Sequence, residues 1–263
     1  MTTDPAALRR ARRQRRLALL RAAGLLPLAE RLAMWREAAR AKRLNGDFAE
    51  DAPMPPARWM HDMYAHADYA HYWSSGQAAA AEVARLIEGV IGPGPHRVAE
   101  WGCGMGRIVR HLVQKHEVTG FDYNDEAVAW CTEHLGGDYS GNGLMPPLPA
   151  EDGAFDAAYA VSVFTHLSEA AHEAWAAELA RILRPGGALV ITMHSAPEPG
   201  QLLPKEQAAF DAGQLVTRGQ VKEGSRAYTA YQPEPYVRRL LDGFEILSVG
   251  SGLGQTAYVA RRR

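Results

Sequence analysis

An apolar segment that runs straight into three alternating glycines constrains the fold of this chain more than any other feature. Residues 98–101 read Val-Ala-Glu-Trp, and Gly102, Gly104 and Gly106 follow before a helical pattern begins. Glycine has no Cβ, so the backbone can turn sharply there and approach a ligand closely. The free amide groups at the start of the following helix then face that ligand. A strand, a glycine-rich turn and a helix in this order predict an α/β sheet that binds a ligand at its carboxyl edge.

An alternation of strands and helices surrounds this turn. Strands are expected over residues 96–101, 117–121, 155–163 and 188–193, with helices over 106–115, 125–134 and 169–183. Such alternation is typical of βαβ units and a mainly parallel sheet. Beyond a helix at 235–241, apolar runs at 244–249 and 255–260 predict an antiparallel hairpin at the sheet edge.

The first 56 residues predict a basic helical extension and linker, in front of an α/β domain over 57–263. Two helices are expected on either side of Gly24 and Pro27, and a linker over 45–56. Residues 1–43 carry eleven Arg and one Lys against three acids, so their net charge is +9 and that of the remainder is −10. A solvated helix explains this charge; the alternatives are contact with an anionic membrane surface, an anionic acceptor, or an acidic patch on a partner subunit of a homo-oligomer.

The whole composition excludes several functional classes. A net charge of −1 argues against nucleic acid as the main partner, and no apolar run has the length of a membrane span. Two cysteines are too few for a disulfide scaffold, and the histidines lack metal-ligand spacing, so no metal site is expected. Without a secretory signal, we expect a cytoplasmic protein.

Two acidic residues narrow the identity of the ligand. In the dinucleotide fingerprint, GxGxxG, the third glycine would fall at position 107, which is Arg107. Here the spacing is GxGxG, and Glu100 in front of it suits a cationic ligand better than a pyrophosphate. Asp122, at the end of the next strand, can accept hydrogen bonds from both hydroxyls of a ribose. Asp122 could instead cap the following helix, although Asn124 can also fill that role.

At this point the chain resembles the class I S-adenosylmethionine-dependent methyltransferases. The resemblance rests on four segments in the right order, residues 98–107, 118–124, 155–167 and 183–191, and it covers about residues 97–193. The strings Glu-Trp-Gly-Cys-Gly, Phe-Asp-Tyr-Asn and Ser-Val-Phe-Thr-His-Leu-Ser resemble a bacterial subgroup met near polysaccharide or secondary-metabolite genes. The resemblance implies S-adenosylmethionine as cofactor and a seven-stranded Rossmann-like sheet, with helices on both faces and an antiparallel last strand.

The resemblance also implies roles for individual residues. The turn from Glu100 through Gly102, Cys103, Gly104 and Gly106 would wrap the methionine part of the cofactor, and Asp122 would hold the ribose. Tyr123 would stack near the adenine, Asn142, Gly143 and Leu144 would contact its edge, and Ser162 would sit beside the cofactor. Tyr72, with Tyr64 and Tyr69, would roof the site; ordinary packing of an N-terminal helix is the alternative.

The expected reaction is methyl transfer to a small-molecule or sugar-containing acceptor, with O-methylation as the expected chemistry. The alternative is a protein of this fold that binds the cofactor as a scaffold or catalyses another reaction. A base is needed only if the acceptor must lose a proton. His166 and His194 follow strand ends; His194 opens the long insertion at 195–232 and is the better candidate, while His166 could be structural. The insertion and the aromatic stretch 59–73 are expected to form the acceptor pocket and lid, although the insertion could be an oligomer contact. Residues 1–43 are expected to be dispensable for cofactor binding.

Overall fold

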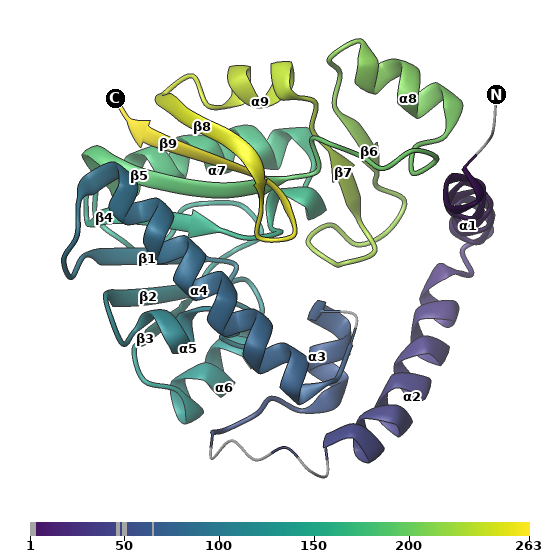
Figure 1. Ribbon diagram of the computed structural model, residues 1–263, viewed down its shortest axis with the longest axis horizontal. Helices are drawn as coiled ribbons and strands as arrows, with labels where there is room; N and C mark the ends of the chain where they lie inside the picture. The colour runs from purple at the N-terminus through teal and green to yellow at the C-terminus, as the bar shows by residue number, and fades with distance from the viewer. Residues whose placement is uncertain (1–3, 46–47, 49–51, 65) are drawn as a thin grey trace.

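A central sheet of seven strands organises the chain, which a computed structural model describes over residues 4–45, 48, 52–64 and 66–263. The strand order is β3-β2-β1-β4-β5-β9-β8, with β9 antiparallel to both of its neighbours and every other pairing parallel (Figure 1). This confirms the expected sheet and its terminal hairpin. The strands are β1 Arg97–Trp101, β2 Glu117–Asp122, β3 Asp138–Gly141, β4 Phe155–Ala160, β5 Leu183–Met193, β8 Phe244–Gly252 and β9 Gln255–Arg262.

Helices cover both faces of the sheet because its central strands are apolar on both faces. Val98 of β1 and Val190 of β5 pack with the face that α4 Tyr69–Ile91 and α5 Val109–Leu112 cover. Ala99 and Leu189, the sequence neighbours of these two valines, pack under α7 Glu169–Ile182 and α9 Glu234–Leu240. This period of two places successive side chains on opposite faces. Helix α6 Asp125–His134 packs beside β2 and β3.

Several element boundaries differ from the expectation for local reasons. The helix expected at 106–115 is short, because Gly102, Gly104 and Gly106 all have positive φ and the chain continues in turns as far as Ile108. The strand expected to reach residue 163 ends at Ala160, and Ser162 adopts φ 64° just beyond it. The short edge strand β3 lacks an apolar run, so its sequence gave no strand signal.

The insertion at 195–232 is structured rather than an open loop. It contains α8 Pro204–Asp211 and an antiparallel pair, β6 Val216–Arg218 with β7 Thr229–Tyr231. Buried Leu202, Val216 and Tyr231 form a small apolar cluster of its own. The Arg218 guanidinium binds the Glu206 carboxylate at 2.6 Å and the Gln201 carbonyl, and it ties the parts of the insertion together.

The N-terminal extension forms two helices, α1 Pro5–Ala22 and α2 Leu26–Leu44, separated at Gly24 with φ +68°. This is the break that the sequence predicts. Residues 46–47 and 49–51 of the expected linker lie outside the described residues. After the linker, α3 Ala57–Tyr64 leads into α4. Within the described ranges, no helix is both long and apolar enough to span a bilayer.

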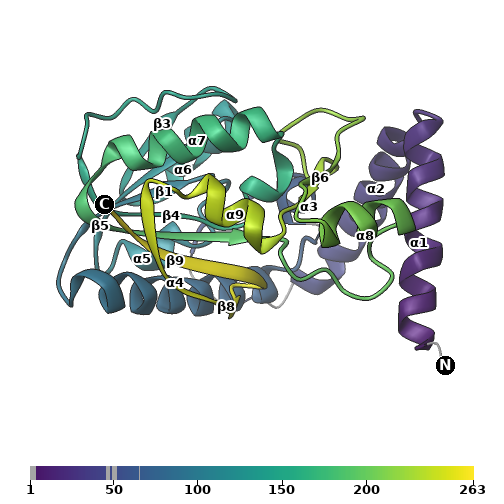
Figure 2. The same cartoon turned by 90° about the horizontal axis from the view of Figure 1, so that it is seen from above.

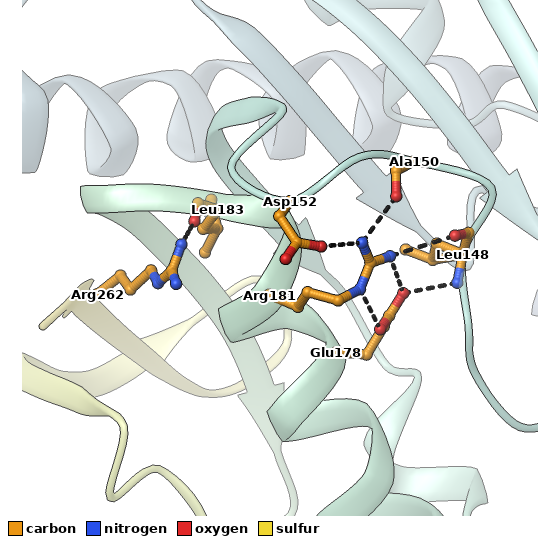
Figure 3. A network of polar contacts seen from close by, with 7 residues as sticks. All are labelled: Leu148, Ala150, Asp152, Glu178, Arg181, Leu183 and Arg262. Atoms are coloured by element: carbon orange, nitrogen blue, oxygen red, sulfur yellow. Dashed lines mark hydrogen bonds and ion pairs between the residues drawn. The ribbon is translucent and has the colours of Figure 1, made fainter.

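A partly buried ion pair holds the segment that leads into β4. Arg181 of α7 binds the carboxylate of Glu178 at 2.7 Å, and Glu178 in turn accepts a hydrogen bond from the Leu148 amide (Figure 3). Arg181 also donates to the Ala150 carbonyl and to Asp152. In the same view Arg262 of β9 donates to the Leu183 carbonyl at the start of β5. These contacts anchor residues 148–152 on α7, so the loop before them has a fixed end.

Candidate functional site

A cavity of about 1120 Å³ lies at the carboxyl ends of β1, β2, β4 and β5. This is where parallel sheets place their ligands. Its volume exceeds the common range for a single small ligand, so a cofactor and an acceptor can share it. Its wall comes from α3 and the first part of α4, the strand ends with their following turns, Trp175 of α7, residues 224–227 of the insertion, and residues 253–255 at the β8–β9 turn. No lining residue lies before Trp59 among the described residues.

The glycine turn forms one wall of the cavity and has no room for side chains. Gly102 and Gly104 both line it. A Cβ on Gly102 would lie 2.3 Å from Cγ2 of Val163, and a Cβ on Gly104 would lie 2.7 Å from the Tyr64 hydroxyl. Both residues have positive φ, which disfavours other residue types. The turn is therefore built for close approach of the backbone to whatever fills the cavity.

Asp122 lies at the end of β2, beside this turn. One carboxylate oxygen accepts a hydrogen bond from the Gly104 amide at 2.8 Å, and the other accepts from the Asn124 amide at 2.9 Å. Burial raises the pKa of Asp122, and these amides oppose the rise. Each oxygen keeps a second lone pair, so the carboxylate can still accept two hydroxyl groups from the cavity. The helix-capping role falls to Asn124, whose side chain accepts from the amides of Glu126 and Ala127.

One part of the cavity wall contains the residues for which the resemblance implies contact with the adenine. Tyr123, Asn142, Gly143 and Leu144 all line the cavity. The Asn142 Oδ1 atom is buried without a hydrogen-bond partner among the described residues, so an acceptor is left for a ligand. Beneath them, Trp101 stacks on Trp175 with ring centroids 4.3 Å apart, and the Trp175 indole donates to the Leu144 carbonyl.

Four of the expected cofactor residues lie behind the turn rather than on the cavity wall. Cys103 is buried, and Gly106 packs closely against Leu135. Tyr72 is fully buried, and its hydroxyl donates to the Met105 carbonyl at 2.8 Å. Glu100 is 4% exposed, and its Oε2 has no hydrogen-bond partner among the described residues. The side chains of Cys103, Tyr72 and Glu100 therefore pack behind the glycine turn. Ser162, in contrast, lines the cavity.

The two candidate histidines both line the cavity, but their hydrogen bonds differ. His194 Nδ1 lies 3.1 Å from the Ala230 carbonyl, and its Nε2 lies 3.1 Å from the side-chain amide of Gln255. Because a carbonyl only accepts, Nδ1 carries the proton and the Nε2 lone pair accepts from Gln255. Burial lowers the pKa of His194 to about 4.

His166 has the same tautomer as His194, but the surroundings of its Nε2 atom are different. Its Nδ1 donates to the Tyr228 carbonyl at 2.7 Å, so Nε2 carries the lone pair. None of the described residues hydrogen-bonds this Nε2. Burial lowers the pKa of His166 as well, so the ring is neutral near pH 7. His166 therefore presents an unengaged acceptor nitrogen in the cavity, whereas that of His194 is engaged.

A chain of hydrogen bonds explains why Gln255 holds His194. The Ser162 amide donates to Thr192 Oγ1, whose hydroxyl then donates to Gln255 Oε1 at 2.6 Å. The Gln255 amide group is left with two hydrogens, which it donates to Ser162 Oγ at 2.8 Å and to His194 Nε2. Every partner is satisfied, so this wall of the cavity is rigid.

Sequence reasoning missed Gln255 and Arg107 as residues of the cavity. Arg107 lines the cavity beside the glycine turn, and its guanidinium lies 5.7 Å from the centroid of the Tyr64 ring. Its position directly after the third glycine is the signal that could have marked it. The insertion lines the cavity with Gly224, Ser225, Arg226 and Ala227. The two insertion tyrosines, Tyr228 and Tyr231, are buried and do not line the cavity.

The insertion is attached to the cavity wall on both sides of the site. The Tyr123 hydroxyl donates to the Gly224 carbonyl at 3.0 Å, and the Gly224 amide donates to the His166 carbonyl at 2.9 Å. The Glu223 carboxylate accepts from the Ser168 amide at 2.7 Å. The loop therefore connects the end of β2 to the turn that carries His166.

Glu100 predicts a pH dependence of stability. Burial raises its pKa from 4.5 to about 8. An acid whose pKa is higher in the folded state contributes stability that is complete below pH 4.5 and is lost as the pH rises toward 8. Replacing Glu100 with Gln should therefore raise the free energy of unfolding near pH 8 by at least about 1 kcal/mol, and the gain should vanish at low pH.

Urea unfolding of the ligand-free protein across this pH range measures the effect. Glu117→Gln, at an exposed position of the neighbouring strand, is the matched control. A Glu100→Gln gain that stays constant across the pH range would contradict the expected ionisation behaviour.

Comparison with known proteins places this site in a family. Residues 99–191 match the model of a methyltransferase-domain family. An uncharacterized 37.1 kDa protein in transposon TN4556 of Streptomyces fradiae is 29% identical over 224 residues, which cover 83% of this chain. They cover 57% of that protein, so the chain spans less than two thirds of the curated relative.

Solved structures share the fold at low sequence identity. DesVI of Streptomyces venezuelae has a TM-score of 0.55 and 15% identity, covering 74% of this chain and 95% of that one. CalS10 of Micromonospora echinaspora, described as an amino pentose methyltransferase, has a TM-score of 0.55 and 18% identity, covering 74% and 96%. The 1,6-didemethyltoxoflavin-N1-methyltransferase of Burkholderia thailandensis has a TM-score of 0.51 and 18% identity, covering 81% and 93%.

The family match spans the glycine turn, Asp122 and strands β2 to β4, and the sheet around it has the strand order expected from the resemblance. Residues 99–191 therefore form a methyltransferase domain, and the sheet around them has the fold of the class I S-adenosylmethionine-dependent methyltransferases, whose cofactor is S-adenosylmethionine.

Proposed function

We propose that this chain transfers a methyl group from S-adenosylmethionine to a hydroxyl of a small-molecule or sugar-containing acceptor. One observation carries the proposal: a single cavity contains the glycine turn and Asp122 together with the unengaged Nε2 of a neutral histidine, His166. Two of the similar structures are an amino pentose methyltransferase and a 1,6-didemethyltoxoflavin methyltransferase, which supports the small-molecule class of acceptor.

The residues at the glycine turn and at the ends of β2 and β3 fit the cofactor. The cradle at Gly102 and Gly104 would receive its methionine part, and the Arg107 guanidinium is a fitting partner for the methionine carboxylate. Asp122 would accept from the ribose hydroxyls, and the unpaired Asn142 Oδ1 would accept from the adenine amino group. When bound, S-adenosylmethionine supplies a methyl group that is already activated by its sulfonium. The protein mainly has to align the acceptor and exclude water.

His166 is the residue that we assign as the base. Its Nε2 would take the proton of the acceptor hydroxyl, while the Tyr228 carbonyl holds Nδ1–H and keeps the ring in the required tautomer. The sequence favours His194 for this role, but the lone pair of His194 Nε2 already accepts from Gln255. We therefore assign His194 to orientation of the cavity wall.

The insertion at 195–232 is proposed as the cover of the acceptor pocket. Its loop over 224–227 bridges Tyr123 and the His166 turn, which is the position needed to exclude water from the reacting groups. The alternative function, a scaffold that binds the cofactor without methyl transfer, needs no base, so it leaves the orientation of His166 without a role.

The test is methyl transfer by the full chain with deuterium-labelled S-adenosylmethionine. Incubation with a panel of amino sugars, sugar nucleotides and small phenols should give S-adenosylhomocysteine and a labelled product of one acceptor class by mass spectrometry. Cofactor binding without labelled product from any class, including extracts of bacterial small molecules, would favour the scaffold alternative.

A further inference from the structure

The two N-terminal helices concentrate the exposed apolar side chains of the protein. Ten large hydrophobic residues are exposed in the described ranges, and six of them lie in or between α1 and α2. Three of the other four, Tyr123, Leu144 and Met145, lie at or next to the cavity. The six are Leu8, Leu19, Leu25, Leu28, Leu32 and Trp35, with exposed fractions from 45% to 72%. Exposed apolar side chains concentrated on two neighbouring helices are typical of a surface that has a partner.

Helix α1 contacts the insertion with one side and carries exposed arginines on the other. On its inner side, Arg10 donates to the Pro199 carbonyl and Arg21 donates to the Ala227 carbonyl, which docks the helix on the insertion. Its outer side carries exposed arginines, and the helix contains no acidic residue between Pro5 and Ala22. These outer arginines are Arg9, Arg12, Arg13, Arg15 and Arg16.

The two helices lie along one flank of the molecule. Figure 1 shows α1 end-on at the right edge with α2 running down the same edge, and Figure 2 shows α1 lying along that edge. Their axes therefore lie close to one plane, beyond the carboxyl ends of the strands (Figure 2). Two helices whose axes lie close to one plane can both contact a flat surface along their length.

We propose that this flank binds the surface of an anionic lipid bilayer. Leucine and tryptophan side chains can enter the boundary between head groups and acyl chains, while arginines pair with the lipid phosphates. The helices are not apolar enough to cross a bilayer, so the binding is interfacial. This interaction goes beyond the proposed methyl transfer and does not depend on it.

Charge favours lipid over a symmetric dimer through this flank. A two-fold dimer would place the flank against its own copy. Residues 1–43 carry a net charge of +9, so two such flanks would repel each other. The phosphates of an anionic bilayer offer the opposite charge.

Vesicle sedimentation of the full chain tests the proposal. Vesicles of phosphatidylcholine alone are compared with vesicles in which part of it is replaced by phosphatidylglycerol. One variant replaces Arg12, Arg13, Arg15 and Arg16 with Gln, and a second replaces Leu28, Leu32 and Trp35 with Ser. The matched controls replace four exposed arginines elsewhere, Arg85, Arg97, Arg238 and Arg239, with Gln, and Leu247 with Ser. Binding of S-adenosylhomocysteine shows that each variant remains folded.

The expected result is sedimentation with the anionic vesicles only, weakened at least about tenfold by each α1–α2 variant and unchanged by the controls. The proposal would be overturned if the α1–α2 variants bound the anionic vesicles as well as the control variants do. It would also be overturned if the unchanged chain did not bind anionic vesicles. A doubled mass in light scattering that is lost in the α1–α2 variants, without vesicle binding, would assign the flank to a second copy instead. A gel shift with nucleic acid but no vesicle binding would also overturn it.

Discussion

Replacing His166 with Asn is expected to lower the rate of methyl transfer by roughly 10²–10⁴-fold, the usual contribution of a positioned base. The asparagine amide can still donate to the Tyr228 carbonyl, so the contact that holds the insertion survives while the Nε2 lone pair is lost. Affinity for S-adenosylhomocysteine should stay within about twofold, because the base touches the acceptor and not the cofactor. Steady-state kinetics and calorimetric titration of the same variant measure both effects.

His194→Asn is the matched control, since it keeps a donor for the Ala230 carbonyl and removes the nitrogen that accepts from Gln255. We expect a smaller loss of rate from it than from His166→Asn. Burial holds the pKa of His166 below its ordinary value of 6.5, so kcat/KM of the unchanged protein should be level near pH 7 and should fall only below pH 6.5. A His166→Asn variant with the full rate, or a larger loss in His194→Asn, would remove His166 as the base.

Replacing Asp122 with Ala is expected to weaken cofactor binding by about 1–3 kcal/mol, the scale of hydrogen bonds to a charged group. The protein should stay folded, although its melting temperature should fall because the buried Gly104 amide loses its partner. Calorimetric titration with S-adenosylhomocysteine and a thermal scan on one sample separate the two quantities.

Asn124→Ala provides the contrast, because Asn124 caps α6 with its side chain. Loss of this cap should cost about 1 kcal/mol of stability and leave cofactor affinity close to that of the unchanged protein. If Asp122→Ala lost stability and kept its affinity, Asp122 would be a structural residue of the turn and not a cofactor ligand.

The sequence was sufficient for the parts of the fold that depend on local pattern. Apolar runs of about five residues predicted the central strands, because a strand covered on both faces has no polar side. The GxGxG spacing predicted a turn, and the positive φ values of all three glycines match it. The same spacing could not show that the turn would shorten α5, since the helical pattern of residues 106–115 continues through the last glycine.

The finer arrangement of the site depends on long-range contacts that local pattern does not encode. His166 and His194 both follow a strand end, so the sequence does not distinguish them. They differ because Gln255, at the start of β9, donates a hydrogen bond to Nε2 of His194. Tyr72 and Tyr64 are also alike, yet Tyr64 lines the cavity while Tyr72 is buried under Met105. The Gly- and Pro-rich composition of the insertion predicts a loop, because its internal pair β6–β7 joins residues too far apart in sequence for a hairpin signal.

The measurement that bears most directly on the assignment is calorimetric titration of the purified full chain with S-adenosylhomocysteine and, separately, with NAD. The glycine turn with Asp122, and Arg107 in place of a third fingerprint glycine, predict binding of S-adenosylhomocysteine at one site per chain and no response to NAD. Binding of NAD with no response to S-adenosylhomocysteine would contradict the assignment of this cavity.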